Sequence, residues 1–222
     1  MPEPMAEAEP KISFMGESAL LLQLEGPMSL EVQRRIWGCA HTLGKRPEVA
    51  ETGVGVHSVL AILSPEANAE ALAEVLPSLW DAADAEEGSG RLIEVPVVFG
   101  GRGGIDLSEV AAAHNLSEAE VVERYCAADY TVFALGSQPG FGYLGGLDPS
   151  LTTPRRSSPR QRVEEGSVMI GGAQAGVLSR SSPSGWHVIG QTELAFFDPL
   201  GDPPALIAPG DRLRFRPAGG ET

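Results

Sequence analysis

Glycine and proline recur at short intervals between Phe133 and Gly190, and this spacing limits the fold more than any other feature of the sequence. Proline lacks a backbone N–H and breaks a helix interior, while glycine weakens helices and reaches positive φ without strain. From residue 128 onward the helical period is absent, and short strand candidates alternate with turn signals. This pattern is typical of a β-barrel. The strand candidates are residues 130–135, 167–170, 187–189, 194–197, 205–207 and 213–215.

The N-terminal part of the chain alternates strand and helix patterns instead. One helix is predicted from an N-cap at Ser29 to about Leu43, and a second from Asn68 to about Trp80, because apolar residues recur there at helical spacing. This order of elements is typical of a small α+β sandwich with its helices on one face of a sheet. The strands are predicted at residues 12–24, with a turn at Gly16, and at residues 54–63; a further strand, residues 92–99, follows this part of the chain.

The segment 81–90 is acidic and rich in small residues, which is typical of a linker. The sequence therefore predicts the α+β fold class, with a small N-terminal α+β sandwich followed by a C-terminal β-barrel. We expect a disordered tail over residues 1–10, the α+β domain over residues 11–90 and the barrel domain over residues 91–222.

Two short helices are expected at the start of the barrel region. A glycine loop at residues 100–104 leads into the first helix, residues 107–114, which Asp106 is expected to cap. Ser117 starts a capping box for the second helix, which runs to about Cys126. The pair has the layout of a DNA-binding helix-turn-helix, but its second helix is acidic and would repel phosphates. The glycine loop lacks the spacing of nucleotide-binding motifs.

Charge and cysteine content exclude several classes of function. The 222 residues carry a formal net charge of −14, whereas nucleic acids and anionic membranes require a basic face. Cys39 and Cys126 are far apart and lack metal-type spacing, which favours free thiols in a reducing compartment. The N-terminus has neither the basic start nor the apolar run of a signal peptide, and no segment is long enough to span a membrane. We therefore expect a cytoplasmic protein.

A short segment of this acidic chain holds four arginines, Arg155, Arg156, Arg160 and Arg162. Arginine on a fixed loop suits a carboxylate or phosphate, so the segment predicts a site for an anionic ligand or intermediate, or a contact with a partner subunit. Solvated arginines on a turn-rich β fold are the alternative. No complete catalytic set or metal-ligand spacing accompanies them, so no catalytic residue is assigned and no metal site is expected. The residues assigned to ligand binding or to an interface are Gln138, Pro139, Phe141, Tyr143, Arg155, Arg160, Arg162, Gly172, Gln174 and Trp186.

Four blocks of sequence in this region have a recognisable order and spacing. They are Pro139-Gly140-Phe141-x-Tyr143-Leu144, Pro154-Arg155-x-x-x-Pro159-Arg160, Gly166-Ser167-Val168 and Ser182-Pro183-x-Gly185-Trp186. Together they resemble the allophanate hydrolase subunit 1 family, which is also called KipI-like and includes the B subunits of 5-oxoprolinase. The likeness extends to Gly16-Glu17-Ser18 near the start of the chain and to Pro209-Gly210-Asp211 near its end.

The resemblance implies a cyclophilin-like barrel and a non-autonomous subunit of a hydrolase complex, which is inactive alone. Its partner would be of the allophanate hydrolase subunit 2 or KipA type. In the 5-oxoprolinase version a further protein, the 5-oxoprolinase A subunit, takes part, and the complex uses ATP to open 5-oxoproline to glutamate; which chain binds ATP is left open. Two alternatives also remain open: a KipI-type regulator that inhibits a sensor histidine kinase, and a cyclophilin-like prolyl isomerase.

Three positions depart from the family's pattern. Gly142 stands where proline is usual, Ala175 stands where threonine is usual, and Tyr125 replaces a usual histidine. These departures leave the substrate open among 5-oxoproline, allophanate and another amide.

Overall fold

The computed structural model describes residues 9–85 and 90–218. Contacts within the chain group it into two compact units, residues 1–88 and 89–222; the predicted domains over residues 11–90 and 91–222 stay a prediction. Most of the predicted tail and part of the predicted linker, residues 1–8 and 86–89, lie outside the described residues. None of the helices in the described part of the chain is long and apolar enough to cross a membrane.

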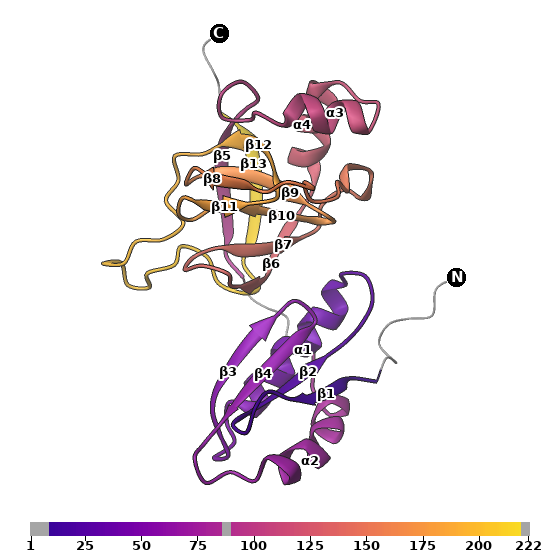
Figure 1. Ribbon diagram of the computed structural model, residues 1–222, viewed down its shortest axis with the longest axis vertical. Helices are drawn as coiled ribbons and strands as arrows, with labels where there is room; N and C mark the ends of the chain where they lie inside the picture. Colours follow the sequence, from indigo (N-terminus) through magenta and orange to yellow (C-terminus); the bar gives the residue numbers. More distant parts are fainter. Residues whose placement is uncertain (1–8, 86–89, 219–222) are drawn as a thin grey trace. The chain divides into compact units, whose positions relative to one another are not determined.

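The N-terminal unit is a four-stranded antiparallel sheet with two helices on one face (Figure 1). Leu20 and Leu22 alternate along one strand and Val59 and Ala61 along another, so their side chains share the face that packs against the helices. The strand order is β1-β2-β4-β3. The elements are β1 (Lys11–Phe14), β2 (Ala19–Gln23), α1 (Leu30–Leu43), β3 (Val49–Gly55), β4 (Ser58–Leu63) and α2 (Ala69–Asp81).

Residues 54–63 contain the end of β3, a turn at residues 56 and 57, and β4, so the single strand predicted there is wrong. The chain reverses at His57, which adopts a positive φ of 52° and is buried. Its backbone N–H donates to Gln33 Oε1 over 2.9 Å, while its ring Nε2 accepts from the backbone N–H of Ser29 over 2.9 Å. Gln33 Nε2 in turn donates to the Gly55 carbonyl over 3.0 Å. These side-chain bonds, which local periodicity does not reveal, hold the turn against the start of α1.

The C-terminal unit is a closed seven-stranded barrel with the strand order β10-β7-β6-β13-β5-β12-β9. All neighbouring strands are antiparallel except β13 and β5, which pair in parallel from Arg212 opposite Leu92 to Pro217 opposite Val97. The barrel strands are β5 (Leu92–Phe99), β6 (Tyr130–Leu135), β7 (Gly142–Gly145), β9 (Ser167–Gly171), β10 (Gln174–Val177), β12 (His187–Gln191) and β13 (Arg212–Pro217). The remaining elements are α3 (Leu107–Ala113), α4 (Glu118–Ala127), the 3-10 helix η2 (Pro149–Leu151), β8 (Arg160–Val163) and β11 (Ser182–Ser184), the last two forming a small separate sheet.

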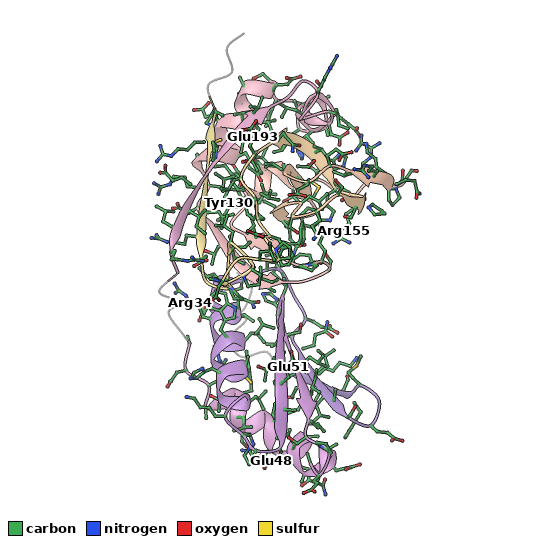
Figure 2. All side chains as sticks on the ribbon, turned by 90° about the vertical axis from the view of Figure 1, so that its left-hand side faces the viewer. Arg34, Glu48, Glu51, Tyr130, Arg155 and Glu193 are labelled. Atoms are coloured by element: carbon green, nitrogen blue, oxygen red, sulfur yellow. The ribbon has the colours of Figure 1, made fainter. Side chains whose placement is uncertain are left out.

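Aromatic rings fill part of the barrel core. Tyr125 from α4 lies 5.1 Å from Tyr130 and 5.0 Å from Phe215, measured between ring centroids. The Tyr130 hydroxyl donates to the Tyr125 carbonyl over 2.9 Å (the position of Tyr130 within the barrel is labelled in Figure 2). Buried aromatic pairs at these separations stabilise a core beyond their area alone. They join α4 to the barrel strands.

The α+β fold with a C-terminal barrel, predicted from the sequence, is confirmed. Two of the predicted strands, residues 194–197 and 205–207, are irregular and share one isolated bridge between Phe197 and Ala205. The short strands β7 and β10 are absent from the sequence-based prediction, because glycine obscures their pattern. Gly145 and Gly176 occur there because a side chain would overlap the Phe133 ring or press against Phe141 and Trp186.

Candidate functional site

A tight turn between β6 and β7 presents the first side chain of the candidate site. The Phe141 N–H donates to the Gln138 carbonyl over 3.2 Å, with Pro139 and Gly140 at the two central positions. Gly140 has a φ of 75°, as the third position of a type II turn requires. The Ser179 hydroxyl holds the turn in place by donating to the Pro139 carbonyl over 2.6 Å. The turn directs the Phe141 ring inward, where it is buried.

Three aromatic rings form the apolar wall of the site. Phe141 lies edge-on to Tyr143 and to Trp186, with ring centroids 5.1 Å and 5.6 Å away. Glycines behind the rings make this packing possible. A Cβ atom on Gly171 would overlap the Trp186 ring, and one on Gly176 would lie 3.0 Å from Phe141. The strands β9 and β10 therefore provide a flat surface for the aromatic side chains.

A pocket of about 300 Å³ opens over this aromatic wall. Its cations are Arg155 and Arg156, and none of the described residues that line it is an aspartate or glutamate. The Arg155 guanidinium carbon lies 5.7 Å from the centre of the Trp186 ring, within the range of a cation–π contact. Figure 2 labels Arg155 at the edge of the barrel. The lining residues are Ser137, Phe141, Tyr143, Arg155, Arg156, Pro159, Met169, Pro183, Ser184, Gly185 and Trp186.

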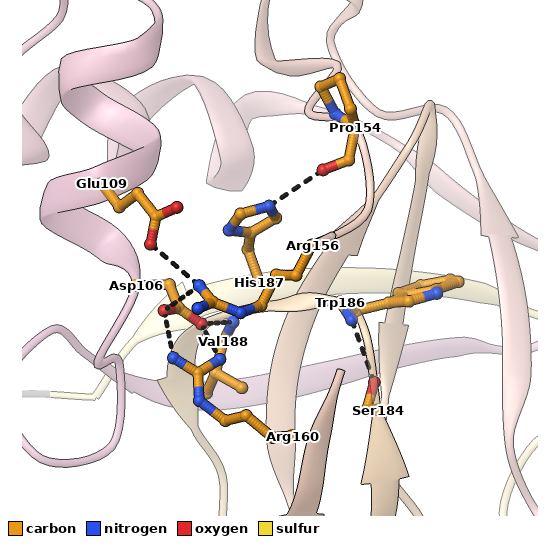
Figure 3. Close-up of polar contacts among 9 residues, drawn as sticks. All are labelled: Asp106, Glu109, Pro154, Arg156, Arg160, Ser184, Trp186, His187 and Val188. Atoms are coloured by element: carbon orange, nitrogen blue, oxygen red, sulfur yellow. Dashed lines mark hydrogen bonds and ion pairs between the residues drawn. The ribbon is translucent and has the colours of Figure 1, made fainter. Parts of the chain in front are cut away.

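A buried carboxylate lies behind the arginine segment (Figure 3). Asp106 is 1% exposed, and its oxygens accept from Arg160 Nη1 over 2.7 Å and from Arg160 Nη2 over 2.6 Å. They also accept from Arg156 Nη1 over 3.2 Å and from the Val188 N–H over 2.8 Å. Burial alone would raise the pKa of Asp106, but the bonds from Arg160 and Val188 outweigh it and hold the pKa below its usual value.

The prediction that the Asp106 side chain caps α3 is wrong. Asp106 stands at the N-cap position, but its side chain makes no hydrogen bond to the helix. The reason is that both of its oxygens point to the arginine segment and to β12 instead. The cap patterns at Ser29, Asn68 and Ser117 are confirmed, since each accepts a backbone N–H from its own helix.

Donor atoms of Asp106, Glu109 and His187 lie within 4.8 Å of one another, close enough to surround a metal ion. However, two guanidinium groups occupy the same cluster, and Arg156 Nη1 binds both Asp106 and Glu109. His187 Nε2 lies 2.9 Å from the Pro154 carbonyl, which assigns the ring proton to Nε2. Because the carboxylates are already neutralised by arginine, we interpret the cluster as an ion-pair network.

The structure brings four of the ten residues predicted from the sequence into one pocket: Phe141, Tyr143, Arg155 and Trp186. Gln138 and Pro139 form the adjoining turn and are not among the described lining residues. The other four also lie outside the lining. Arg160 binds Asp106, Arg162 binds Glu164 at the surface over 2.7 Å, Gly172 pairs with Thr153, and Gln174 starts β10 beside Gly171.

Sequence reasoning missed the role of Asp106 and the contributions of Ser137, Pro183 and Ser184 to the pocket. Asp106 precedes Arg160 by 54 residues, so no local spacing links the two. An aspartate directly before a helix is also readily explained as its N-cap, so the sequence gives no reason to look for partners of Asp106 elsewhere in the chain. Ser137 adopts a positive φ of 59°, a conformation rare for serine that a single sequence does not reveal.

Comparison with known proteins identifies relatives over most of the chain. The family model for the carboxyltransferase domain, subdomain C and D, matches residues 10–207. The chain is 48% identical to the 5-oxoprolinase B subunit of Escherichia coli O157:H7 over 205 residues, which are 92% of this chain and 94% of that protein. It is 38% identical to the 5-oxoprolinase B subunit of Haemophilus influenzae over 201 residues, which are 90% of this chain and 94% of that protein.

Among solved structures, the crystal structure of TTHA0988 matches 92% of this chain with a TM-score of 0.77 and 32% sequence identity. The chain spans 40% of the length of that protein. The family model and both relatives cover most of the sequence, including the turn, the arginine segment and the aromatic wall described above. The chain therefore belongs to the family of the 5-oxoprolinase B subunits and allophanate hydrolase subunit 1, within the carboxyltransferase subdomain C and D group.

Proposed function

We propose that this chain is the B subunit of an ATP-dependent hydrolase complex that opens the ring of 5-oxoproline to give glutamate. The observation that carries the proposal is its 48% identity to the Escherichia coli B subunit over 94% of that protein. A likeness along the whole length supports the same place in a complex, which a shared fold alone would not. A KipI-type regulator is not favoured, because the relatives bear the name of an enzyme subunit.

The chemistry of the pocket supports a binding role for this subunit. Opening a cyclic amide requires a nucleophile and an activated carbonyl. The hydroxyls of Ser137 and Ser184 have no histidine, lysine or carboxylate beside them among the described lining residues that could activate them as nucleophiles. Arg155 over Trp186 instead offers a guanidinium to the carboxylate of the substrate. Bond cleavage and the use of ATP would then need groups from partner subunits, and the isolated chain would be inactive.

The proposed partners are a protein of the allophanate hydrolase subunit 2 or KipA type and the 5-oxoprolinase A subunit, in a cytoplasmic complex. The counterpart of this chain in TTHA0988 is 40% of a longer polypeptide, so in that protein it is covalently joined to further sequence. We propose Gln138, Pro139, Gly172, Gln174 and Arg162 for the subunit interface, since none of them is among the described residues that line the pocket.

The test is 5-oxoproline-dependent release of phosphate and glutamate by the purified chain, by its complex with a KipA-type partner, and by the mixture that also contains the 5-oxoprolinase A subunit. Activity is expected only when the partners are present. Turnover of allophanate or another amide by the same mixture, with none of 5-oxoproline, would overturn the choice of substrate. Full activity of the partners without this chain would overturn its place in the complex.

Two arginines of the barrel unit provide a matched pair of substitutions to test the site. Arg155→Met keeps the apolar stem over Trp186 but removes the guanidinium, and it should raise KM for 5-oxoproline by about tenfold or more. Arg216→Gln removes an arginine that pairs with Glu94 at the surface and has no place in the proposed site or interface, so it should leave KM unchanged. Equal effects of the two substitutions would show that the pocket is not the substrate site.

A further inference from the structure

The carboxylate oxygens of Asp106 are fully used, and every bond that they accept comes from outside the helix that Asp106 precedes. The carboxylate accepts two bonds from Arg160, one from Arg156 and one from the Val188 N–H. A carboxylate has about four acceptor positions, so none is left for the backbone of α3. The Asp106 N–H donates to the Val188 carbonyl over 2.8 Å, which fixes the same residue to β12 from a second direction. Asp106 therefore joins β12 to the arginine segment.

The arginines that Asp106 holds, Arg156 and Arg160, follow Arg155 in the sequence by one and five residues. The backbone around Arg155 is also fixed, because the Arg156 N–H donates to the Gly185 carbonyl over 2.8 Å and His187 Nε2 binds the Pro154 carbonyl over 2.9 Å (Figure 3). These contacts place Arg155 beside the bend at Gly185 and Trp186, between β11 and β12. The direction of the Arg155 side chain thus depends on how its neighbours are anchored.

Asp106 also determines which arginines of the segment are paired with a carboxylate. Asp106 and Glu109 together neutralise Arg156 and Arg160, and Glu164 neutralises Arg162. Within residues 9–85 and 90–218, Arg155 has a ring contact with Trp186 and no ion pair. The pocket thereby presents one unpaired guanidinium to an anion, from a segment that holds four.

We infer that Asp106 is a positioning residue for the pocket: by binding Arg156 and Arg160 it keeps Arg155 over Trp186 and leaves it the unpaired cation of the site. This inference rests on the ligand site proposed above. A purely structural role for Asp106 would lower stability without any link to Arg155, which Asp106 does not bind in the described structure. Energetic coupling between these two residues is what separates the two roles.

The experiment is ¹⁹F NMR of the full chain labelled with 5-fluorotryptophan. The sequence holds three tryptophans, of which Trp37 and Trp80 belong to the N-terminal unit, and Trp186→Phe assigns the third resonance. Asp106→Asn should shift the Trp186 resonance and leave the other two in place. Arg155→Met should also shift it. In the Arg155→Met background, Asp106→Asn should add little further shift, because its effect passes through Arg155.

The matched control is Glu164→Gln, which removes a carboxylate from an arginine pair in the same region but at the surface. It should leave the Trp186 resonance unchanged. If Asp106→Asn prevents folding, Arg160→Gln takes its place, since it breaks the same network from a side chain that is 26% exposed. An unmoved Trp186 resonance in either folded variant, or fully additive shifts with Arg155→Met, would overturn the inference.

The reconstituted complex adds a second readout. Asp106→Asn should raise KM for 5-oxoproline by about tenfold with a smaller change in kcat, and it should have no further effect on KM when Arg155 is already replaced. Additive effects on KM would overturn the inference in the same way as additive shifts. The NMR measurement needs neither partner nor substrate, so failure of the proposed reaction would not by itself decide whether Asp106 positions Arg155.

Discussion

The N-terminal unit and the barrel unit each fix a loop to the start of a helix with buried polar side chains, but they use different chemistry. In the N-terminal unit the network is neutral. The Gln33 amide binds the His57 N–H and the Gly55 carbonyl, and the His57 imidazole accepts the Ser29 N–H. In the barrel unit the network is ionic: the Asp106 carboxylate binds two arginines and a backbone N–H. All three of these acceptor side chains are nearly inaccessible, with exposed fractions of 0%, 4% and 1%.

The difference concerns what happens when one partner is lost. A buried amide that loses its partner leaves one unsatisfied group, which costs about 1–3 kcal/mol. A buried carboxylate or guanidinium that loses its partner leaves an uncompensated charge, which costs about 3–5 kcal/mol. The barrel network is therefore the more fragile to substitution, and it is also the one that lies beside the pocket. Substitutions that break one network at a time test this contrast between ionic and neutral chemistry.

The largest loss of unfolding free energy is expected for Asp106→Ala. It leaves Arg156 and Arg160 partly buried without their shared carboxylate, so the barrel unit should lose about 3–5 kcal/mol of unfolding free energy. Urea denaturation followed by the fluorotryptophan resonance of Trp186 reports on this unit, while Trp37 and Trp80 report on the other. A loss below about 1 kcal/mol would mean that water satisfies the arginines and that the network is not an ionic anchor.

The next effect is expected for Gln33→Ala in the N-terminal unit. It removes the acceptor of the His57 N–H and the donor to the Gly55 carbonyl, which should cost about 1–3 kcal/mol. The same urea titration measures it through the resonances of Trp37 and Trp80. A loss as large as that of Asp106→Ala would erase the contrast between the two networks.

The sequence predicts the parts of these networks that depend on local spacing. The caps at Ser29, Asn68 and Ser117 follow from residue type and from apolar periodicity within one or two turns. The partners of Asp106 and Gln33 lie far along the chain, 24 residues away for the His57 N–H and 54 for Arg160, and no local rule connects them. A capping residue and a buried ion-pair residue look the same in a single sequence.

The candidate site also has a part that the sequence predicts and a part that it does not. Turn chemistry and the family resemblance bring Phe141, Tyr143, Arg155 and Trp186 to attention as one group, and the structure places them in one pocket. Which of the four arginines stays unpaired depends on a carboxylate about 50 residues upstream, at Asp106, and on the exposed Glu164. Composition shows only that the cluster is basic.

The third expected effect is that the stability of the two units depends differently on pH. Burial lowers the pKa of His57 in the folded protein, and its neutral Nε2 accepts the Ser29 N–H. A histidine with a lowered folded pKa contributes stability that is fully present above its unfolded pKa of about 6.5 and is lost as the pH falls below that value. Each unit of pKa difference corresponds to about 1.4 kcal/mol. The N-terminal unit should thus lose stability as the pH falls below about 6.5.

Between about pH 7.5 and 5.5 the Asp106 network should keep its contribution to the stability of the barrel unit. The pKa of Asp106 lies below its usual value in the folded protein, so its contribution is present above the unfolded pKa of about 3.9 and is lost only as the pH falls through the lower, folded value. Thermal unfolding at about pH 7.5, 6.5 and 5.5, followed by the separate tryptophan resonances, measures both units. His57→Gln is the control, since it removes the titrating ring. Parallel losses in the two units, unchanged in that variant, would show that His57 is not the cause.

The smallest effect is expected for Glu164→Gln, which removes an ionic bond of good geometry that lies at the surface. Glu164 accepts from Arg162 over 2.7 and 3.1 Å, but the two side chains are 64% and 70% exposed. Water solvates both groups after the bond is lost, so the unfolding free energy should not change measurably, and salt at about 0.5 M NaCl should make any difference smaller still. The same urea titration measures it. If this pair contributed as much as the one at Asp106, burial could not be the reason for the difference between the two arginine–carboxylate contacts. The distinction between an anchored Arg160 and a solvated Arg162 would then have to come from geometry alone.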